Sequence, residues 1–223
     1  MRRAAFFDLD GTLLTVNSAH LWIRRERRLG RVSLWQLIRV AVMLAGYRLG
    51  FLNMERALRA ALGQLVGVPE SDIRAQTRQW WIDEVRPFIA PGAKAVVEQH
   101  RKDGDLLVLL TSSSKYASEM AIEEFGLDGA LFQGYEVKDG LFTGHPLKPI
   151  CYGVGKVEAA EAWAKINQVD LAASSFYSDS STDVPMLARV GKPVVVHPDP
   201  RLKFVARRRG WPVIDWKQAA QAK

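Results

Sequence analysis

Short, uninterrupted apolar runs recur along this chain and alternate with segments of helical spacing. Four of the runs are typical of buried strands, at residues 4–10, 105–113, 174–179 and 193–199. The helical patterns between them lie at residues 92–104, 115–126 and 156–168. Strands that are apolar on both sides and alternate with helices are typical of a parallel sheet covered on both faces. We therefore predict an α/β fold with a doubly wound parallel sheet, and a small hairpin at 134–144 around an Asp-Gly turn.

The segment after the first apolar run has a different character. Residues 17–86 contain tryptophan, arginine and leucine at helical spacing and no strand-like run, which predicts an inserted helical cap domain. Prolines near residue 86 mark the return to the sheet, so the predicted core comprises 1–16 and 87–223. The most apolar stretch, 34–52, is interrupted by arginines and is too short for the roughly 20 residues of a membrane span. We expect it to form a helix packed within the protein.

Charge and cysteine content narrow the classes of partner and compartment. The formal net charge is +7, which favours anionic partners such as phosphorylated metabolites, nucleic acid or acidic lipid. We interpret the basic clusters at 24–31 and 207–211 as solvated helix faces and a basic tail. The single cysteine, Cys151, cannot form an internal disulfide and fits a reducing compartment. With no recognisable export signal, we expect a cytoplasmic protein without a transmembrane segment.

Polar side chains follow the predicted strands at the edge where ligands of open α/β sheets bind. The first strand runs into two aspartates, the second into a threonine and serines, and the third into a further pair of aspartates. A lysine opens the helix before the third strand. These residues are Asp8, Asp10, Thr111, Ser112, Asp179, Asp183 and Lys156. Because their segments alternate with helices, we expect them to assemble one pocket.

The residue types in this set suit phosphoryl transfer. A carboxylate nucleophile 4 Å from another negative charge is repelled by about 4 kcal/mol at an effective dielectric of 20. Mg²⁺ bound by Asp8 and Asp179, together with Lys156, would offset that repulsion. Thr111 and the backbone N–H after it would hold phosphoryl oxygens, and Asp10 would act as acid and base. Taken singly, these aspartates and Thr111 could be turn or capping residues, and Lys156 could be a solvated helix residue.

Four ordered motifs resemble those of the haloacid dehalogenase superfamily, in its phosphoserine-phosphatase-like branch. They are "DLDGT" (8–12), "LLVLLTSS" (106–113), Lys156 and "YSDSSTD" (177–183). The resemblance implies a Rossmann-like core with a helical cap inserted after the first strand. It also implies that Asp8 is the nucleophile, forming an aspartyl-phosphate, and that Asp10 is the general acid and base. Thr111 and Lys156 would bind the transferring group, and Mg²⁺ would be held by Asp8, the Asp10 backbone carbonyl and Asp179, supported by Asp183.

Two departures from that pattern bear on the substrate. Asn17 stands where phosphoserine phosphatases have a glutamate that binds the substrate's amino group, which counts against phosphoserine. Thr182 replaces the asparagine usual before the last motif aspartate. Together with His20 and Ser112, these two residues are our predicted substrate-binding side chains. The ending at 191–214 resembles a bacterial group with members similar to histidinol-phosphate phosphatases.

The sequence thus predicts a Mg²⁺-dependent phosphomonoester hydrolase acting on a small phosphorylated metabolite. By the same resemblance, Asp10 favours a phosphatase, with a sugar phosphomutase as the weaker alternative, because dehalogenases of the superfamily lack an acid at that place. The alternatives are a dedicated phosphoserine or histidinol-phosphate phosphatase, or a phospho-ligand or nucleic-acid binding module with weak or no catalysis. Nucleic acid is not the expected partner. Weak membrane-surface contact through residues 34–52 is a third hypothesis.

Overall fold

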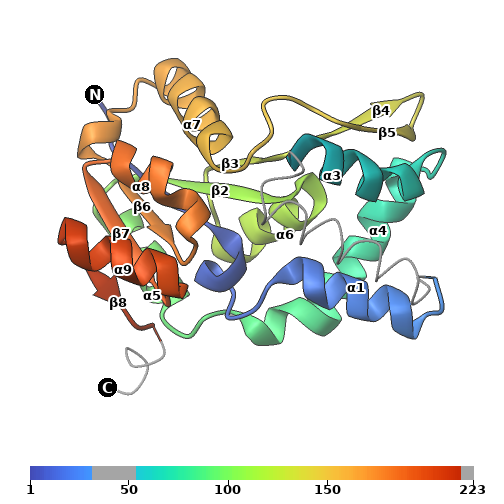
Figure 1. Cartoon of the computed structure of the whole chain (residues 1–223), viewed down its shortest axis with the longest axis horizontal. Coiled ribbons are helices and arrows are strands. Elements are labelled where there is room, and N and C mark those ends of the chain that lie inside the picture. Colours follow the sequence, from blue (N-terminus) through green and yellow to red (C-terminus); the bar gives the residue numbers. More distant parts are fainter. Residues whose placement is uncertain (32–53, 217–223) are drawn as a thin grey trace.

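A six-stranded parallel sheet forms the centre of the protein, seen in a computed structural model that describes residues 1–31 and 54–216. The strands lie in the order β3-β2-β1-β6-β7-β8 (Figure 1). They are β1 (Ala4–Phe7), β2 (Leu106–Ser114), β3 (Gly129–Gln133), β6 (Ser175–Ser178), β7 (Lys192–Val196) and β8 (Val213–Ile214). The helices that flank them are α5 (Ala93–Lys102), α6 (Lys115–Phe125), α7 (Val154–Asn167), α8 (Val184–Arg189) and α9 (Pro200–Arg209). The predicted α/β class is confirmed.

Burial on both faces of the sheet explains why the strands read as continuous apolar runs. In β1, Ala5 and Phe7 join one core cluster with residues of α5 and α6. Ala4 and Phe6 point to the opposite face, where they pack in a second cluster with residues of α7, α8 and α9. All four side chains are at most 1% exposed. Since successive strand residues face opposite sides, each strand needs apolar residues at every position.

Both edges of the sheet differ from the sequence prediction. The edge strands β3 and β8 were not predicted, because β3 is mostly half-buried and β8 has only two residues. The prediction of a basic tail at 207–211 is wrong, since Arg207–Arg209 form the last turn of helix α9. Asp199 caps this helix by accepting a hydrogen bond from Leu202 N (2.8 Å), and Pro200 occupies its first turn.

The predicted hairpin is present and reaches from the core to the inserted segment. Its strands are β4 (Tyr135–Lys138) and β5 (Leu141–Pro146), paired antiparallel. Phe142 exchanges backbone hydrogen bonds with the loop before α4, donating to Val68 O (3.0 Å) and accepting from Gly67 N (2.9 Å). Figure 1 shows the hairpin extending beside α3 and α4. The inserted segment is therefore contacted by a second part of the core chain.

The described part of the inserted segment is helical, as predicted. Its helices are α1 (Ser18–Arg28), α3 (Met54–Leu62) and α4 (Glu70–Trp80), followed by short helical turns to Phe88. The helix predicted at 34–52 lies outside the described residues. The two connections to the core pair with each other, since Thr15 N donates to Phe88 O (2.8 Å) and Ala90 N donates to Leu13 O (2.9 Å). Within residues 1–31 and 54–216, no helix has the length and apolar character needed to cross a membrane.

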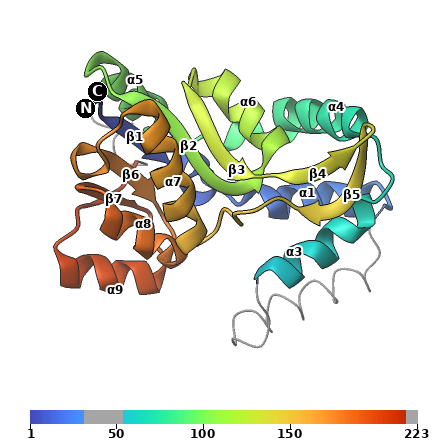
Figure 2. The same cartoon turned by 90° about the horizontal axis from the view of Figure 1, so that it is seen from above.

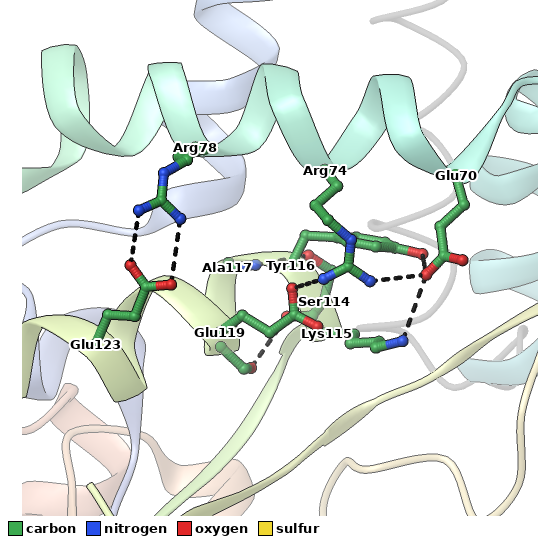
Figure 3. A network of polar contacts seen from close by, with 10 residues as sticks. Glu70, Arg74, Arg78, Ser114, Lys115, Tyr116, Ala117, Glu119 and Glu123 are labelled. Atoms are coloured by element: carbon green, nitrogen blue, oxygen red, sulfur yellow. Dashed lines mark hydrogen bonds and ion pairs between the residues drawn. The ribbon is translucent and has the colours of Figure 1, made fainter. Parts of the chain in front are cut away.

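A ladder of ion pairs joins helix α4 of the inserted segment to helix α6 of the core (Figure 3). Its rungs connect residues 45 positions apart in sequence, at successive helical turns. They are Glu70–Lys115, Arg74–Glu119 and Arg78–Glu123. The constant separation means that the two helices run parallel and in register. Glu70 also accepts a hydrogen bond from Tyr116 Oη (3.1 Å), and its N–H donates to Gly140 O (2.8 Å) in the hairpin turn.

We expect the middle rung of this ladder to contribute more to stability than the outer rung at Arg78. Arg74 contacts both Glu119 and Glu70, and its guanidinium lies 5.4 Å from the centre of the Tyr116 ring. Alanine variants of Arg74 and Glu119, single and double, should give a coupling free energy of about 0.5–1 kcal/mol in urea unfolding. The matched control is Arg78–Glu123, whose side chains are 59% and 56% exposed. Its coupling should fall below about 0.3 kcal/mol; an equal or larger value would contradict this ranking.

Candidate active site

Asp8 and Asp179 leave neighbouring strands at the same edge of the sheet. Strands β1 and β6 pair in parallel, with Phe7 opposite Tyr177. The pairing continues one step further, because Asp8 N donates to Tyr177 O at 3.0 Å. Asp8 therefore begins the turn after β1, and Asp179 follows the last residue of β6 directly. Parallel pairing thus brings together two carboxylates that are 171 positions apart in sequence.

Lys156 connects two acidic side chains from different segments. Its Nζ lies 3.0 Å from Asp8 Oδ1 and 2.7 Å from Asp183 Oδ2. Asp183 Oδ2 also accepts a hydrogen bond from Ser178 Oγ (2.8 Å). Asp8, Lys156 and Asp183 are 7%, 2% and 1% exposed, so the three charges are held away from solvent. Lys156 occupies the first turn of α7, which the preceding Gly153 can begin with a φ of 56°.

Burial and the excess of acidic over basic side chains shift the pKa values of this cluster. Burial raises the pKa of Asp8 to about 7, against the opposing charge of Lys156. Burial, together with the nearby charge of Asp8, raises the pKa of Asp179 to about 8. Burial opposes the charge of Lys156, but the carboxylates of Asp183 and Asp8 outweigh it and raise the Lys156 pKa. When all three carboxyl groups are ionised, three acids beside one ammonium group leave negative charge that a bound cation would neutralise.

Asp10 points toward the inserted segment and links it to the end of β2. Its Oδ1 accepts a hydrogen bond from Ser18 N (2.7 Å), at the start of α1. Its Oδ2 accepts one from Ser113 Oγ (2.8 Å). The Asp10 carboxylate is thus oriented by the first residue of the helical insertion and by the hydroxyl loop after β2. Ser113 was not singled out in the sequence, because three consecutive serines give no signal of which one faces the site.

The other residues of the strand-end loops that we predict to bind phosphate or substrate occupy different environments. Thr111 is fully buried, and its Oγ1 accepts a hydrogen bond from Ser113 N (3.0 Å). Ser112 is exposed, on the other side of the strand end. Thr182 is half-buried, and its hydroxyl lies 2.9 Å from Ser180 Oγ. Thr111 is therefore held in place at the buried end of β2, whereas the Ser112 side chain faces solvent.

Asn17 and His20 lie at the start of α1. The Asn17 side chain accepts a hydrogen bond from His20 N at 3.2 Å, which makes Asn17 the N-cap of this helix. Both side chains are exposed. Because α1 begins beside Asp10, the Asn17 and His20 side chains lie near the cluster. The side-chain amide oxygen of Asn17 is occupied by capping the helix.

Two further residues shape the loop around Asp179. A Cβ atom placed on Gly11 would lie 2.1 Å from Asp179 Oδ2, so the Asp179 carboxyl packs against the bare backbone of Gly11. Asp199 accepts a hydrogen bond from Ser181 N (2.6 Å), and its N–H donates to Asp179 O (2.9 Å). Burial opposes the Asp199 charge, but donors including Leu202 N and Ser181 N outweigh it and lower the pKa of Asp199. The Asp-Pro step before α9 was the available sequence signal for this cap.

The side chains around Asp8 fit a hard divalent cation such as Mg²⁺. The acidic side chains of the cluster offer only carboxylate oxygens as metal ligands. Gly11 has no side chain and therefore leaves room for the Asp179 carboxyl group. Among the described residues, no three acidic, histidine or cysteine side chains gather as a metal centre. Mg²⁺ sites often use only one or two carboxylates, with water and substrate phosphate completing the shell. Asp8 and Asp179 are the residues that would hold the ion here.

Comparison with known proteins agrees with the fold and indicates a family of hydrolases. The family model described as haloacid dehalogenase-like hydrolase matches residues 5–188. A histidinol-phosphatase of Neisseria meningitidis is 27% identical over 97% of this chain and 100% of its own. A phosphoserine phosphatase of Mycobacterium tuberculosis is 30% identical over 98% of this chain and 72% of its own.

The protein also resembles a solved structure over almost its whole length. A Bordetella pertussis protein of unknown function superposes with a TM-score of 0.88 and 32% identity, covering 97% of this chain and 99% of its own. The residues matched by the family model include the strand ends that carry Asp8, Thr111 and Asp179. The chain belongs to the haloacid dehalogenase-like hydrolases.

Proposed function

We propose that this protein is a Mg²⁺-dependent phosphatase that hydrolyses a small phosphomonoester through an aspartyl-phosphate on Asp8. The observation that carries the proposal is the buried cluster in which Lys156 Nζ contacts both Asp8 and Asp183, beside Asp179. Related proteins named as phosphatases support the same class of reaction. We further propose that residues 17–86 act as a cap on a core of 1–16 and 87–223.

In the proposed reaction Asp8 attacks phosphorus and Asp10 protonates the leaving oxygen. Lys156 balances charge on the phosphoryl group, since its Nζ already lies 3.0 Å from the nucleophile. The Thr111 hydroxyl donates to a phosphoryl oxygen, because its lone pair accepts from Ser113 N and its proton is free to point away. Mg²⁺, when bound, would offset the repulsion between Asp8 and the phosphate. Asp10 then removes a proton from the water that hydrolyses the acyl-phosphate.

Substrate choice is proposed to lie with the inserted segment and the hydroxyl loops. Asn17, His20, Ser112 and Thr182 are the candidate contacts. Asn17 is neutral and caps α1, so it offers no carboxylate to a substrate ammonium group. Histidinol phosphate is the first substrate to test, because the Neisseria histidinol-phosphatase aligns along its entire length. Phosphoserine is the second, on the strength of the mycobacterial relative.

We propose the cytoplasm as the compartment, because the single cysteine, Cys151, is a free thiol and fits a reducing environment.

The Cys151 side chain is also buried, with an exposure of 2%. Burial raises its pKa to about 12, so it is not suited to act as a nucleophile.

Removal of divalent cations should abolish phosphatase activity and Mg²⁺ should restore it. We expect phosphate release from one or more members of a panel containing histidinol phosphate, phosphoserine and p-nitrophenyl phosphate. Treatment with EDTA followed by desalting should reduce the rate to background, because Asp8 and the phosphate would then repel each other. Readdition of Mg²⁺, but not of an equal ionic strength of NaCl, should recover it. Undiminished turnover after chelation would contradict the metal dependence, and phosphate release from no member would contradict the proposed function.

A further inference from the structure

Helix α9 presents a cationic face around one exposed aromatic side chain. Leu202 and Ala206 turn inward and are fully buried. Besides Arg209, whose guanidinium lies 5.1 Å from the centre of the Trp211 ring, the exposed side chains are Arg201, Lys203, Phe204, Arg207 and Arg208. Phe204 is 59% exposed and lies at the middle of this face, with the Arg208 guanidinium 5.6 Å from its ring centre. We call these five residues the α9 face. No acidic residue occurs between Pro200 and Arg209.

The charges of the α9 face are not neutralised by the protein. Elsewhere, arginines such as Arg74, Arg86 and Arg189 are paired with glutamates. In the part of the chain that the structure describes, no ion pair involves a cation of the α9 face. The segments 32–53 and 217–223 contain no aspartate or glutamate that could supply one. The N-cap carboxylate of Asp199 lies at the start of α9, where it accepts hydrogen bonds from backbone N–H groups of Ser181 and Leu202. The four positive charges of the α9 face therefore have no side-chain ion-pair partner among the described residues.

Helix stability does not explain the positions of these charges. Cations in the last turn, such as Arg207 and Arg208, interact favourably with the helix dipole. Arg201 and Lys203 lie in the first turn, where the same dipole opposes a positive charge. Acidic residues there would stabilise α9 better. Arg201 and Lys203 thus indicate a use outside the helix itself.

We propose that the α9 face docks on an anionic lipid surface. A convex helix with an aromatic side chain between cations can place all five side chains on a flat, negatively charged layer at once. A nucleic-acid strand usually binds in a groove with several aromatic platforms, whereas this face offers one, Phe204. Figures 1 and 2 show α9 at the end of the molecule opposite α1, α3 and α4.

Vesicle co-sedimentation of the full chain tests this assignment. We expect binding to phosphatidylcholine vesicles that contain about 30% phosphatidylserine, little binding to pure phosphatidylcholine, and release by salt. Arg201→Glu/Lys203→Glu should reduce the partition coefficient at least about 25-fold, at about fivefold per charge removed. These glutamates suit the first turn of α9, so the melting temperature should not fall. Phe204→Ser should weaken binding without changing its salt dependence.

The matched control is Arg24→Glu/Arg27→Glu, which changes net charge equally on exposed positions of α1. Binding of this control should stay within about threefold of the parent protein. Equal losses in both double variants would show that net charge alone drives binding and would overturn the proposal. Vesicle binding by Arg201→Glu/Lys203→Glu that equals that of the parent protein would overturn the proposal as well. If the protein does not bind vesicles but binds a single-stranded oligonucleotide through α9, the proposal is wrong and the α9 face is a nucleic-acid site. The outcome is independent of phosphatase activity, which the α9 variant should retain in the absence of vesicles.

Discussion

Asp8→Asn is expected to lower turnover of p-nitrophenyl phosphate by at least about a thousandfold while the protein remains folded. The amide keeps the shape of the carboxyl group but cannot act as the nucleophile that Asp8 supplies in the proposed reaction. Lys156 retains its contact with Asp183 at 2.7 Å, so the substitution does not leave the lysine unpaired. The measurement is kcat/KM with saturating Mg²⁺, accompanied by thermal unfolding.

The stability readout for Asp8→Asn has a definite sign. Burial raises the pKa of Asp8 to about 7, which means that the folded protein disfavours its charged form relative to the unfolded chain. A neutral isostere removes that cost at pH values above 7, so the melting temperature should be unchanged or higher. Asp103→Asn, at the exposed end of α5, is the matched control and should leave both turnover and melting temperature unchanged. Substantial turnover by Asp8→Asn would eliminate the aspartyl-phosphate mechanism.

The sheet was predictable because its strands are buried on both faces. Continuous apolar runs mark β1, β2, β6 and β7, and the helical patterns between them fix parallel connections. β3 and β8 lack this signal, since an edge strand needs backbone pairing and only a half-buried surface. Their existence depends on neighbours that are distant in sequence, such as the pairing of Val195 with Val213.

The order of the polar residues at the strand ends was likewise visible in the sequence, but their individual contacts were not. Which serine after Thr111 reaches Asp10 depends on the strand's final twist, where the pairing of β2 with β3 shifts register. Asn17 could equally have been a substrate contact or a helix cap from its sequence alone, and in the structure it caps α1. The α4–α6 ladder requires two helices to run in register, which no local pattern reveals. The types and order of the polar residues can be read from the sequence. The contacts between particular side chains depend on the three-dimensional fold.

Gly11→Ala should reduce kcat/KM by about a hundredfold through displacement of Asp179. The new Cβ would begin 2.1 Å from Asp179 Oδ2, and real Cβ contacts stay beyond 3.0 Å, so the carboxyl group must move. A misplacement of about 1 Å at a reacting centre can cost on the order of 10²-fold in rate. Because Asp179 is proposed to hold Mg²⁺, the Mg²⁺ concentration for half-maximal activity should rise as well.

Backbone strain must be separated from this displacement, and the chain offers a control for it. Gly11 and Gly104 share a φ of +74°, where an alanine is strained by roughly 1–2 kcal/mol. A Cβ on Gly104 would meet no atom within 4 Å, so Gly104→Ala carries the strain without the clash. Both variants should therefore lose stability in urea unfolding, while Gly11→Ala alone should lose activity and demand more Mg²⁺. Equal activities in the two variants would show that the position of the Asp179 carboxyl is not critical, and would remove it from the proposed metal site.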